Sequence, residues 1–279
     1  MTTANNVLRP VASRGWLRGF ANLLGHELHL WWGTRQWLMQ SLIWILLING
    51  AVAFMAIGIA TARRTMDPAE AQQLTPDGVY SMLVQIFVKV AVLCTAVGAV
   101  VSAQGTLIQE KQMGTAAWIL SKPVSRAAFV VAKVFAYALG LLVLCMLVPT
   151  IIFYAEISLF AGSSPAPRDL LAAMGIWSLS ILFYLAFAIM LGAFLNSRGA
   201  VLGIGLGFML LGGFAPLALP QLTAVFPWAF GDIAVALALG PGTAQTLPSS
   251  LMILPVIATS VWIVIFTALA IRRFGKEEF

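Results

Sequence analysis

The sequence predicts an all-α membrane protein with six transmembrane helices, an N-terminal interfacial amphipathic helix and a short cytoplasmic helix between the second and third spans. Two observations predict this fold class. Apolar residues make up 61% of the 279 residues and charged residues only 9%, whereas a soluble domain carries roughly 25% charged residues. Apolar runs of about 20 residues, enough to cross a bilayer as a helix, recur six times. This composition excludes a soluble domain and a disordered chain.

The apolar runs also predict the organisation of the chain. An N-terminal segment, 1–37, precedes a transmembrane domain, 38–271, and a cytoplasmic tail, 272–279. We expect the first run to be a permanent span and not a signal peptide, because no small-residue cleavage pattern follows a short apolar core. The six predicted spans are Leu38–Ala60, Ser81–Ala103, Phe129–Ala155, Leu170–Leu195, Gly199–Leu219 and Leu251–Ile271.

The basic residues predict the orientation. With the N-terminus in the cytoplasm, twelve of the sixteen Lys and Arg residues lie on the cytoplasmic side, three lie outside, and Lys89 lies within a span. This asymmetry follows the positive-inside rule. We therefore expect a multi-pass protein of the cell membrane with both termini in the cytoplasm. The net charge of +6 follows from the same bias, which indicates contact with anionic membrane lipid and not with nucleic acid.

Residues 14–32 have the period of an amphipathic helix. The apolar side chains recur every three or four positions, which places them on one face, and Trp faces lipid headgroups in helices that lie in the interface plane. Glu27 falls within this apolar face and needs a partner there; Arg35 is one possible partner, and a contact with another part of the membrane domain is the other. A simple anchor or a polar tail is the alternative. The two histidines, His26 and His29, are expected to be interfacial polar residues and not metal ligands. The apolar face comprises Leu17, Phe20, Leu24, Leu28 and Trp31.

The loop at 104–128 contains the pattern of a short helix. Gly114 predicts a break, and the hydroxyl of Thr115 can cap the helix that follows. Residues 116–120 would form one or two turns before Pro123 ends them. This would expose Trp118 beneath the membrane, where a short helix can dock into the groove of a partner. The residues alone favour an ordinary structured loop equally. The flanking charged residues are Glu110, Lys111, Lys122 and Arg126.

The same loop resembles that of the permease subunits of type-2 ABC exporters. The resemblance rests on the string Glu110-x-x-x-Gly114-Thr115-x-x-x-x-Leu120-Ser121-x-Pro123-Val124-Ser125-Arg126, followed by Lys133. The step His26-Glu27-Leu28 and the following Arg35 are similar to the interfacial helix of that family. Two departures occur, because His26 replaces a basic residue and Ala132 stands where a glycine commonly precedes the lysine. In motif the resemblance covers about 40 residues, and in topology the whole chain.

The resemblance implies a transmembrane subunit that forms the substrate path of an ATP-driven exporter. In that family two permeases, identical or related, pair with two cytoplasmic ABC ATPase subunits, which bind ATP and Mg. The interfacial helix and the loop transmit closure of the ATPases to the membrane helices. We therefore expect no cofactor in this chain. The residues expected to couple it to the ATPase are Glu27, Arg35, Glu110, Gly114, Thr115, Trp118, Ser121, Pro123 and Arg126.

The sequence offers no chemistry of its own. It contains no Gly-x-x-x-x-Gly-Lys-Ser/Thr phosphate loop and no catalytic or metal-binding constellation, so we expect a transport subunit and not an enzyme. Cys94 and Cys145 both lie in apolar runs and are expected to behave as small buried hydrophobes.

Five residues within the predicted spans are candidates for the pathway or for helix packing. Lys89 is a functional candidate because intramembrane charges are expensive, although it can also snorkel toward the outer surface. Pro149 frees the carbonyl of Cys145, and we expect Lys89 to point at this kink. Three glycines spaced four residues apart favour close helix packing, within the chain or between subunits, and the resemblance favours a dimer interface. These glycines are Gly199, Gly203 and Gly207.

Residues 220–250 form a long apolar segment that is interrupted by prolines. We expect a re-entrant or outer hairpin, because irregular backbone at membrane depth survives only when protein covers it. Asp232 would then face the exit or the other subunit. The alternative function is that of a non-ABC membrane protein, such as a secondary transporter or a membrane anchor subunit of a respiratory complex. The former predicts internal repeats and intramembrane acids, and a haem-bearing anchor predicts histidines within spans, which this sequence lacks.

Overall fold

The computed structural model describes residues 15–67, 70, 74–114, 124–218, 220–240 and 249–277, and these form helices joined by short turns without a strand. The all-α class is therefore confirmed. In chain order the elements are α1 (Phe20–Trp32), α2 (Gln36–Thr65), α4 (Pro76–Ala103), α5 (Thr106–Gln112), α7 (Arg126–Leu141), the π-helical segment η1 (Leu142–Leu147), α8 (Val148–Ala161), α9 (Pro167–Phe194), α10 (Arg198–Ala218), α11 (Pro220–Thr223), the 3₁₀ segment η2 (Pro227–Ala229), α12 (Phe230–Leu239) and α13 (Ser249–Gly275).

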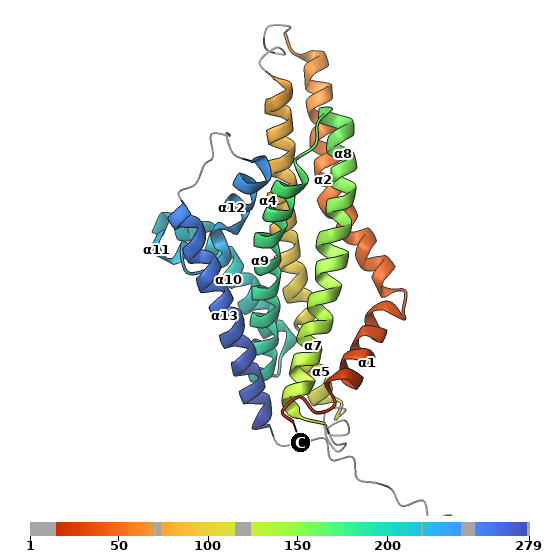
Figure 1. Ribbon diagram of the computed structural model, residues 1–279, viewed down its shortest axis with the longest axis vertical. Coiled ribbons are helices and arrows are strands. Elements are labelled where there is room, and N and C mark those ends of the chain that lie inside the picture. The colour runs from red at the N-terminus through yellow and green to blue at the C-terminus, as the bar shows by residue number, and fades with distance from the viewer. Residues whose placement is uncertain are drawn as a thin grey trace, which may run out of the picture.

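The long helices stand side by side in a bundle whose centre is formed by α4 and α9 (Figure 1). More than half of the apolar window of each of these two helices is buried, against 28% in α2 and 17% in α13. The central position explains why their sequences are apolar on nearly every face. At the upper end of Figure 1, α10 and α13 end near α11, whereas α2, α4 and α8 extend further.

A buried polar contact and stacked rings hold the two central helices in register. The indole Nε1 of Trp177 in α9 donates to the Thr95 hydroxyl in α4 at 2.6 Å, and that hydroxyl donates to the Ala91 carbonyl at 2.7 Å. Phe87 lies beside Trp177 and stacks on Phe153 of α8, with ring centroids 3.8 Å apart. Because buried polar groups need partners, this contact fixes the relative height of α4 and α9.

The predicted third span is a continuous rod of α7, η1 and α8. Its irregular turn lies immediately before Pro149, which has no N–H to offer to the preceding turn. The carbonyl of Pro149 accepts from Asn49 Nδ2 of α2 at 3.0 Å, and the same nitrogen lies 3.0 Å from the Glu156 carboxylate. The prolyl turn is therefore fixed by α2.

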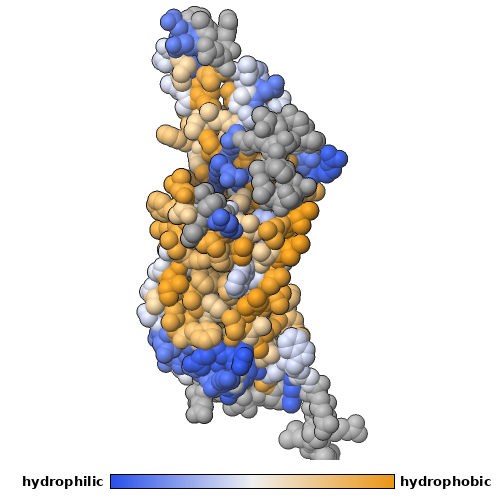
Figure 2. Space-filling model, turned by 90° about the vertical axis from the view of Figure 1, so that its left-hand side faces the viewer, coloured by the Kyte–Doolittle hydropathy of each residue, from blue (hydrophilic) through white to orange (hydrophobic). Residues whose placement is uncertain are grey.

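Five of the expected spans correspond to helices that are long and apolar enough to cross a membrane. They are α2, α4 with α5, α7 with α8, α9 and α13. The fifth expected span corresponds to α10, of which Arg198–Phe214 forms a shorter apolar stretch. Figure 2 shows the apolar band on the face that bears α10, α12 and α13, with hydrophilic residues gathered at its lower end.

The first helix is shorter than its sequence pattern. The period predicts a helix over 14–32, whereas α1 begins at Phe20 after a turn in which Gly19 has a φ of +82°. Glu27 and Trp31 are buried, while His26 and His29 are exposed, so the two predicted faces are present. α1 packs on α7 through edge-to-face pairs of Phe20 with Phe135 and of Trp31 with Tyr137. The partners in each pair are far apart in the sequence, so only the fold brings them together.

The apolar segment at 220–240 folds back onto the bundle. Its longest helix, α12, has ten residues, which is about 15 Å at 1.5 Å per residue and too short to cross a bilayer. α12 packs against α4 and α9 and buries Phe230, Ile233, Val235 and two alanines. α12 lies at the end of the bundle where α13 meets α11 (Figure 1), and the re-entrant or outer hairpin stays a prediction.

Close approach of α2 to α4 generates the first prediction. A Cβ at Gly98 would lie 2.3 Å from the Trp44 ring, whereas a Cβ at Gly58, on the exposed face of α2, meets nothing within 4 Å. We expect Gly98→Ala to lower the free energy of unfolding by about 1–3 kcal/mol through overpacking, measured by thermal unfolding in a mild detergent. Gly58→Ala is the matched control and should unfold at the wild-type temperature or above it. Equal stabilities of the two variants would contradict the packing described.

Candidate functional site

Three charged side chains meet at the lower end of the bundle in Figure 1, where α1, α5 and α7 converge. The Lys133 ammonium of α7 lies 2.6 Å from the Glu27 carboxylate of α1 and also forms an ion pair with Glu110 of α5. The exposed fractions of the three side chains are 3% for Lys133, 8% for Glu27 and 18% for Glu110. The cluster therefore joins three separate elements through charges that water barely reaches.

Local packing explains why these charges are buried together. Trp31 of α1 lies against Gly140 of α7, where an added Cβ would lie 2.6 Å from the indole ring. This close approach presses the apolar face of α1, with Glu27 in it, onto α7. The Lys133 ammonium also lies 5.0 Å from the centroid of the Phe129 ring, a distance at which an aromatic face attracts a cation.

The cluster has a strict electrostatic requirement. Two carboxylates share one ammonium in a buried environment, where each ion loses several kcal/mol of hydration. Removal of one partner from such a group leaves an uncompensated buried charge, which costs about 3–5 kcal/mol. A displacement of α1 or α5 must therefore carry α7 with it, or break a costly contact.

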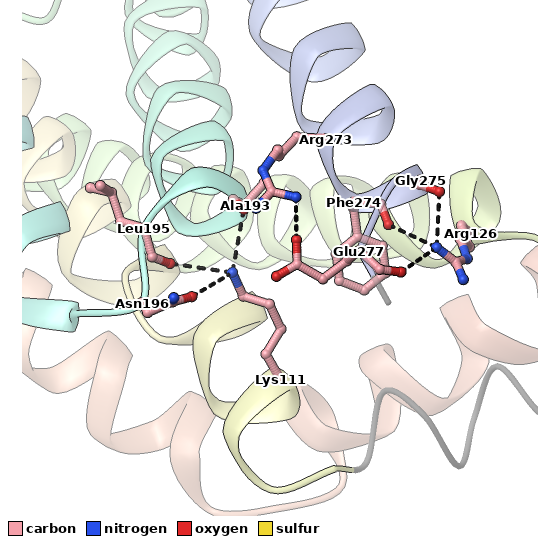
Figure 3. A network of polar contacts seen from close by, with 9 residues as sticks. All are labelled: Lys111, Arg126, Ala193, Leu195, Asn196, Arg273, Phe274, Gly275 and Glu277. Atoms are coloured by element: carbon pink, nitrogen blue, oxygen red, sulfur yellow. Dashed lines mark hydrogen bonds and ion pairs between the residues drawn. The ribbon is translucent and has the colours of Figure 1, made fainter. Parts of the chain in front are cut away.

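A second set of contacts surrounds the same end of the bundle (Figure 3). The Lys111 ammonium, at the end of α5, lies 3.3 Å from the carbonyls of Ala193 and Leu195 and 3.2 Å from the Asn196 Oδ1 atom. The last carbonyls of a helix have no partner within it, and a cation close to them is favourable. Lys111 thus caps α9 and fixes α5 to the turn between α9 and α10.

Arg126 caps the C-terminal end of the last helix, α13, in the same way (Figure 3). Its guanidinium donates to the Gly275 carbonyl at 2.9 Å and to the Glu277 carbonyl at 2.6 Å, beyond the end of α13. The Glu277 carboxylate pairs with Arg273 in the preceding turn. Arg126 is also the first residue of α7. The start of α7 is therefore attached to the end of α13.

The described start of the chain reaches the same place. The Ser125 N–H donates to the Arg18 carbonyl at 3.0 Å, and the Ser125 hydroxyl bonds the Trp16 carbonyl. Ser125 also caps α7, because its hydroxyl oxygen accepts from the Ala128 N–H at 3.0 Å. Trp16, the second described residue, and Glu277, the last one, thus lie beside the neighbouring residues Ser125 and Arg126.

The structure assigns some of the predicted coupling residues to this region and leaves others outside the described residues. Glu27, Glu110 and Arg126 take part in the contacts above. Gly114 has a φ of +69° directly after α5, so the predicted break at this residue is confirmed. The remaining residues of the loop, with the short helix expected at 116–120, lie outside the described residues; they are Thr115, Trp118, Ser121 and Pro123.

Of the two possible partners of Glu27, Arg35 was wrong, and a contact with another part of the membrane domain is confirmed. Arg35 is exposed at the start of α2, and the Glu27 carboxylate pairs with Lys133 instead. The helical period relates Glu27 only to its neighbours along the chain, whereas its partner is 106 positions away. The sequence analysis named Lys133 only as the last residue of the family motif and not as a partner of Glu27. A lysine inside the predicted span Phe129–Ala155 was the signal that could have found it.

The expected contact of Lys89 with the kink at Pro149 was also wrong. Its ammonium lies 3.0 Å from the Asp232 carboxylate of α12, and Asn49 contacts the Pro149 carbonyl instead. Counting residues gives the height of a side chain along its helix but not its direction around the axis. Asp232, expected at the exit or the other subunit, lies at a cavity between α4 and α12.

The three spaced glycines of α10 do not pack within the chain as described. A Cβ at Gly203 or Gly207 meets nothing within 4 Å, and one at Gly199 meets only the Ser197 hydroxyl at 3.7 Å. The close contacts of α10 involve other glycines, because Gly205 lies against Val100 and Gly212 against Trp228. The described contacts therefore do not support the alternative of packing within the chain.

The family model described as ABC-2 family transporter protein matches residues 34–279, which include every predicted span, Glu110 and Lys133, but not α1 with Glu27. No curated protein matches the chain. The match does not favour a secondary transporter or a respiratory membrane anchor.

The buried cluster generates the second prediction. We expect Lys133→Met to lower the free energy of unfolding by about 3–5 kcal/mol, because two buried carboxylates lose their cation, as measured by thermal unfolding of the purified chain. Adding Glu27→Gln and Glu110→Gln to this variant should restore most of the loss, since no buried charge then remains unpaired. Arg64→Met, at an exposed cation in the last turn of α2, is the control. If Lys133→Met and Arg64→Met are equally stable, the cluster does not hold the three elements together.

Proposed function

Because this chain belongs to the ABC-2 family of transporter proteins, we propose that it is the permease subunit of an ATP-driven exporter. In this role it forms the substrate path and separate ABC ATPase subunits supply the energy. ATP and Mg are bound by those subunits, and the chain itself needs no cofactor. Family membership supports a membrane component of a transporter, and the coupling and the direction of transport are our inference.

One observation carries the coupling role, namely the buried Glu27–Lys133–Glu110 cluster. It joins the N-terminal helix α1, the end of the α4–α5 rod and the start of the α7–α8 rod. The predicted docking segment, which follows Gly114 and precedes Val124, lies outside the described residues, and its neighbours in the chain are α5 on one side and α7 on the other. A force applied there reaches both rods through the cluster, and reaches α9 and α13 through the caps of Lys111 and Arg126.

The positions of the chain ends and of the basic residues support an orientation in the membrane and a set of partners. Both described chain ends lie at one end of the bundle, as an even number of crossings requires, and α10 added to the five longer spans makes six. We place this end in the cytoplasm of a cell-membrane protein, because most of the basic residues gather there. The partners are two cytoplasmic ABC ATPase subunits, membrane lipid and a second permease, identical or related.

The glycine at the entry to the docking segment provides the third prediction. Gly114 and Gly162 share a φ of +69°, and a Cβ at either position meets nothing within 4 Å. A valine at either site is therefore strained by its backbone alone, by about 1–2 kcal/mol. We expect Gly114→Val to reduce co-purification of the ATPase and ATP hydrolysis by the complex, because the docking segment is redirected. The measurements are the ATPase-to-permease ratio and the hydrolysis rate in nanodiscs.

Gly162→Val is the matched control, since Gly162 ends α8 at the other end of the bundle. It should retain the ATPase and its activity. If both variants behave alike, the loop after Gly114 is not the ATPase contact. If the wild-type chain carries no ATPase at all, the coupling role fails outright.

The open glycine face of α10 provides the fourth prediction, which concerns the second permease. Gly203 faces open space, and small residues at this spacing let another helix approach closely. In a Cys94→Ala/Cys145→Ala background, we expect Gly203→Cys to form a disulfide-linked dimer in native membranes after mild oxidation, scored by non-reducing gel electrophoresis. Gly175→Cys, at an exposed glycine of α9, should remain uncross-linked. Equal cross-linking at both positions would contradict a specific interface on α10 between two copies.

A further inference from the structure

A cavity of about 370 Å³ lies between α4, α9, α10 and the α12 hairpin, on the side of the molecule seen in Figure 2. This volume falls in the range of small-molecule sites. Most of its wall is apolar or aromatic, and includes Tyr184, Met209 and Trp228. Its charged lining residues are Lys89 and Asp232.

The ion pair at this cavity has spare bonding capacity. Lys89 and Asp232 lie 3.0 Å apart, and their side chains are 55% and 68% exposed. An ammonium has three donors and a carboxylate about four acceptor sites, so one contact leaves most of this capacity available. Such an exposed pair contributes little to stability. Because charges at membrane depth are costly, stability alone does not account for its presence.

The rest of the wall fits an apolar body. Gly213 and Gly231 line the cavity, and a Cβ at either would meet nothing within 4 Å, so a ligand can approach the backbone closely. Trp228 and Tyr184 present aromatic surface, which binds both alkyl groups and cations. Ser180 adds a hydroxyl. A small charged region thus adjoins a larger apolar one.

We propose that this cavity binds an amphipathic zwitterion, with its anionic group at Lys89 and its cationic group at Asp232. The two site charges cancel, so a ligand of one charge would pair with one of these side chains and leave the other without an ionic partner. A ligand with both charges compensates both side chains, and its apolar body fills the remaining space. This inference deepens the proposed function by naming the class of cargo, but binding itself requires neither ATP nor an ATPase.

Titration of the full-length chain with probes of matched tail tests the proposal. Octylphosphocholine is zwitterionic, octyl phosphate is anionic and octyltrimethylammonium is cationic. Binding is measured by calorimetry below the critical micelle concentration of each probe, with the chain in a neutral maltoside detergent. We expect saturable binding of octylphosphocholine, about tenfold tighter than that of either singly charged probe, because each charge-assisted contact has roughly this effect.

Charge variants provide the decisive signature. Lys89→Gln leaves the carboxylate and should shift the preference to octyltrimethylammonium, whereas Asp232→Asn leaves the ammonium and should shift it to octyl phosphate. The exchange variant Lys89→Asp/Asp232→Lys should again prefer octylphosphocholine. A purely structural ion pair would change the affinities for the three probes in the same direction, and that result would overturn the proposal.

Two further arms separate the parts of the proposal. Gly213→Leu should fill the cavity and weaken binding of octylphosphocholine by about tenfold or more, while Gly175→Leu, at an exposed glycine outside the cavity, should leave it unchanged. Phosphocholine without a tail should bind weakly, and equal affinity would overturn the amphipathic assignment in favour of a soluble zwitterion. Because no arm uses ATP, failure of binding is distinguishable from loss of the ATPase in the Gly114→Val comparison.

Discussion

The buried ammonium of Lys133 is the constraint on which the lower end of the bundle depends. It compensates carboxylates from α1 and α5 at once, and neither carboxylate can remain buried without it. One ammonium therefore joins three separate helices, in addition to the apolar contacts of α1 with α7. An apolar contact would have allowed each of them to slide, because hydrophobic packing is not directional.

The contacts around this cluster extend the constraint to the remaining spans. Lys111 and Arg126 stand on either side of the segment that begins after Gly114, and they cap α9 and α13. The cluster and the caps together make the lower end a polar platform. Above it, the helices are held by apolar packing with isolated polar contacts, such as that of Trp177 with Thr95. In the proposed coupling, a force applied at this platform would therefore act on four helical rods, namely α4–α5, α7–α8, α9 and α13.

The sequence was sufficient for features that depend on neighbouring residues. Run length located five helices long and apolar enough to cross a membrane, the helical period located both faces of α1, and glycine at 114 marked a positive φ. It failed wherever direction around a helix axis mattered. Glu27 was paired with Arg35, and Lys89 with the turn at Pro149, because height along a helix is readable from spacing whereas the facing helix is decided by tertiary packing. Lys133 was overlooked for the same reason, although a lysine within an apolar span was visible.

Two of the described ionic groups, the Lys133 cluster and the Lys89–Asp232 pair, differ in the property that decides their proposed roles. The Lys133 cluster is almost fully buried, so breaking it exposes the entire cost of an unpaired internal charge, and it can transmit displacement. The Lys89–Asp232 pair is more than half exposed, so water already compensates much of each charge and the pair opens at little cost. An ion pair that opens easily can exchange its partner for those of a ligand. The same chemistry thus suits coupling at one end of the bundle and recognition at the cavity, and the difference between them is burial.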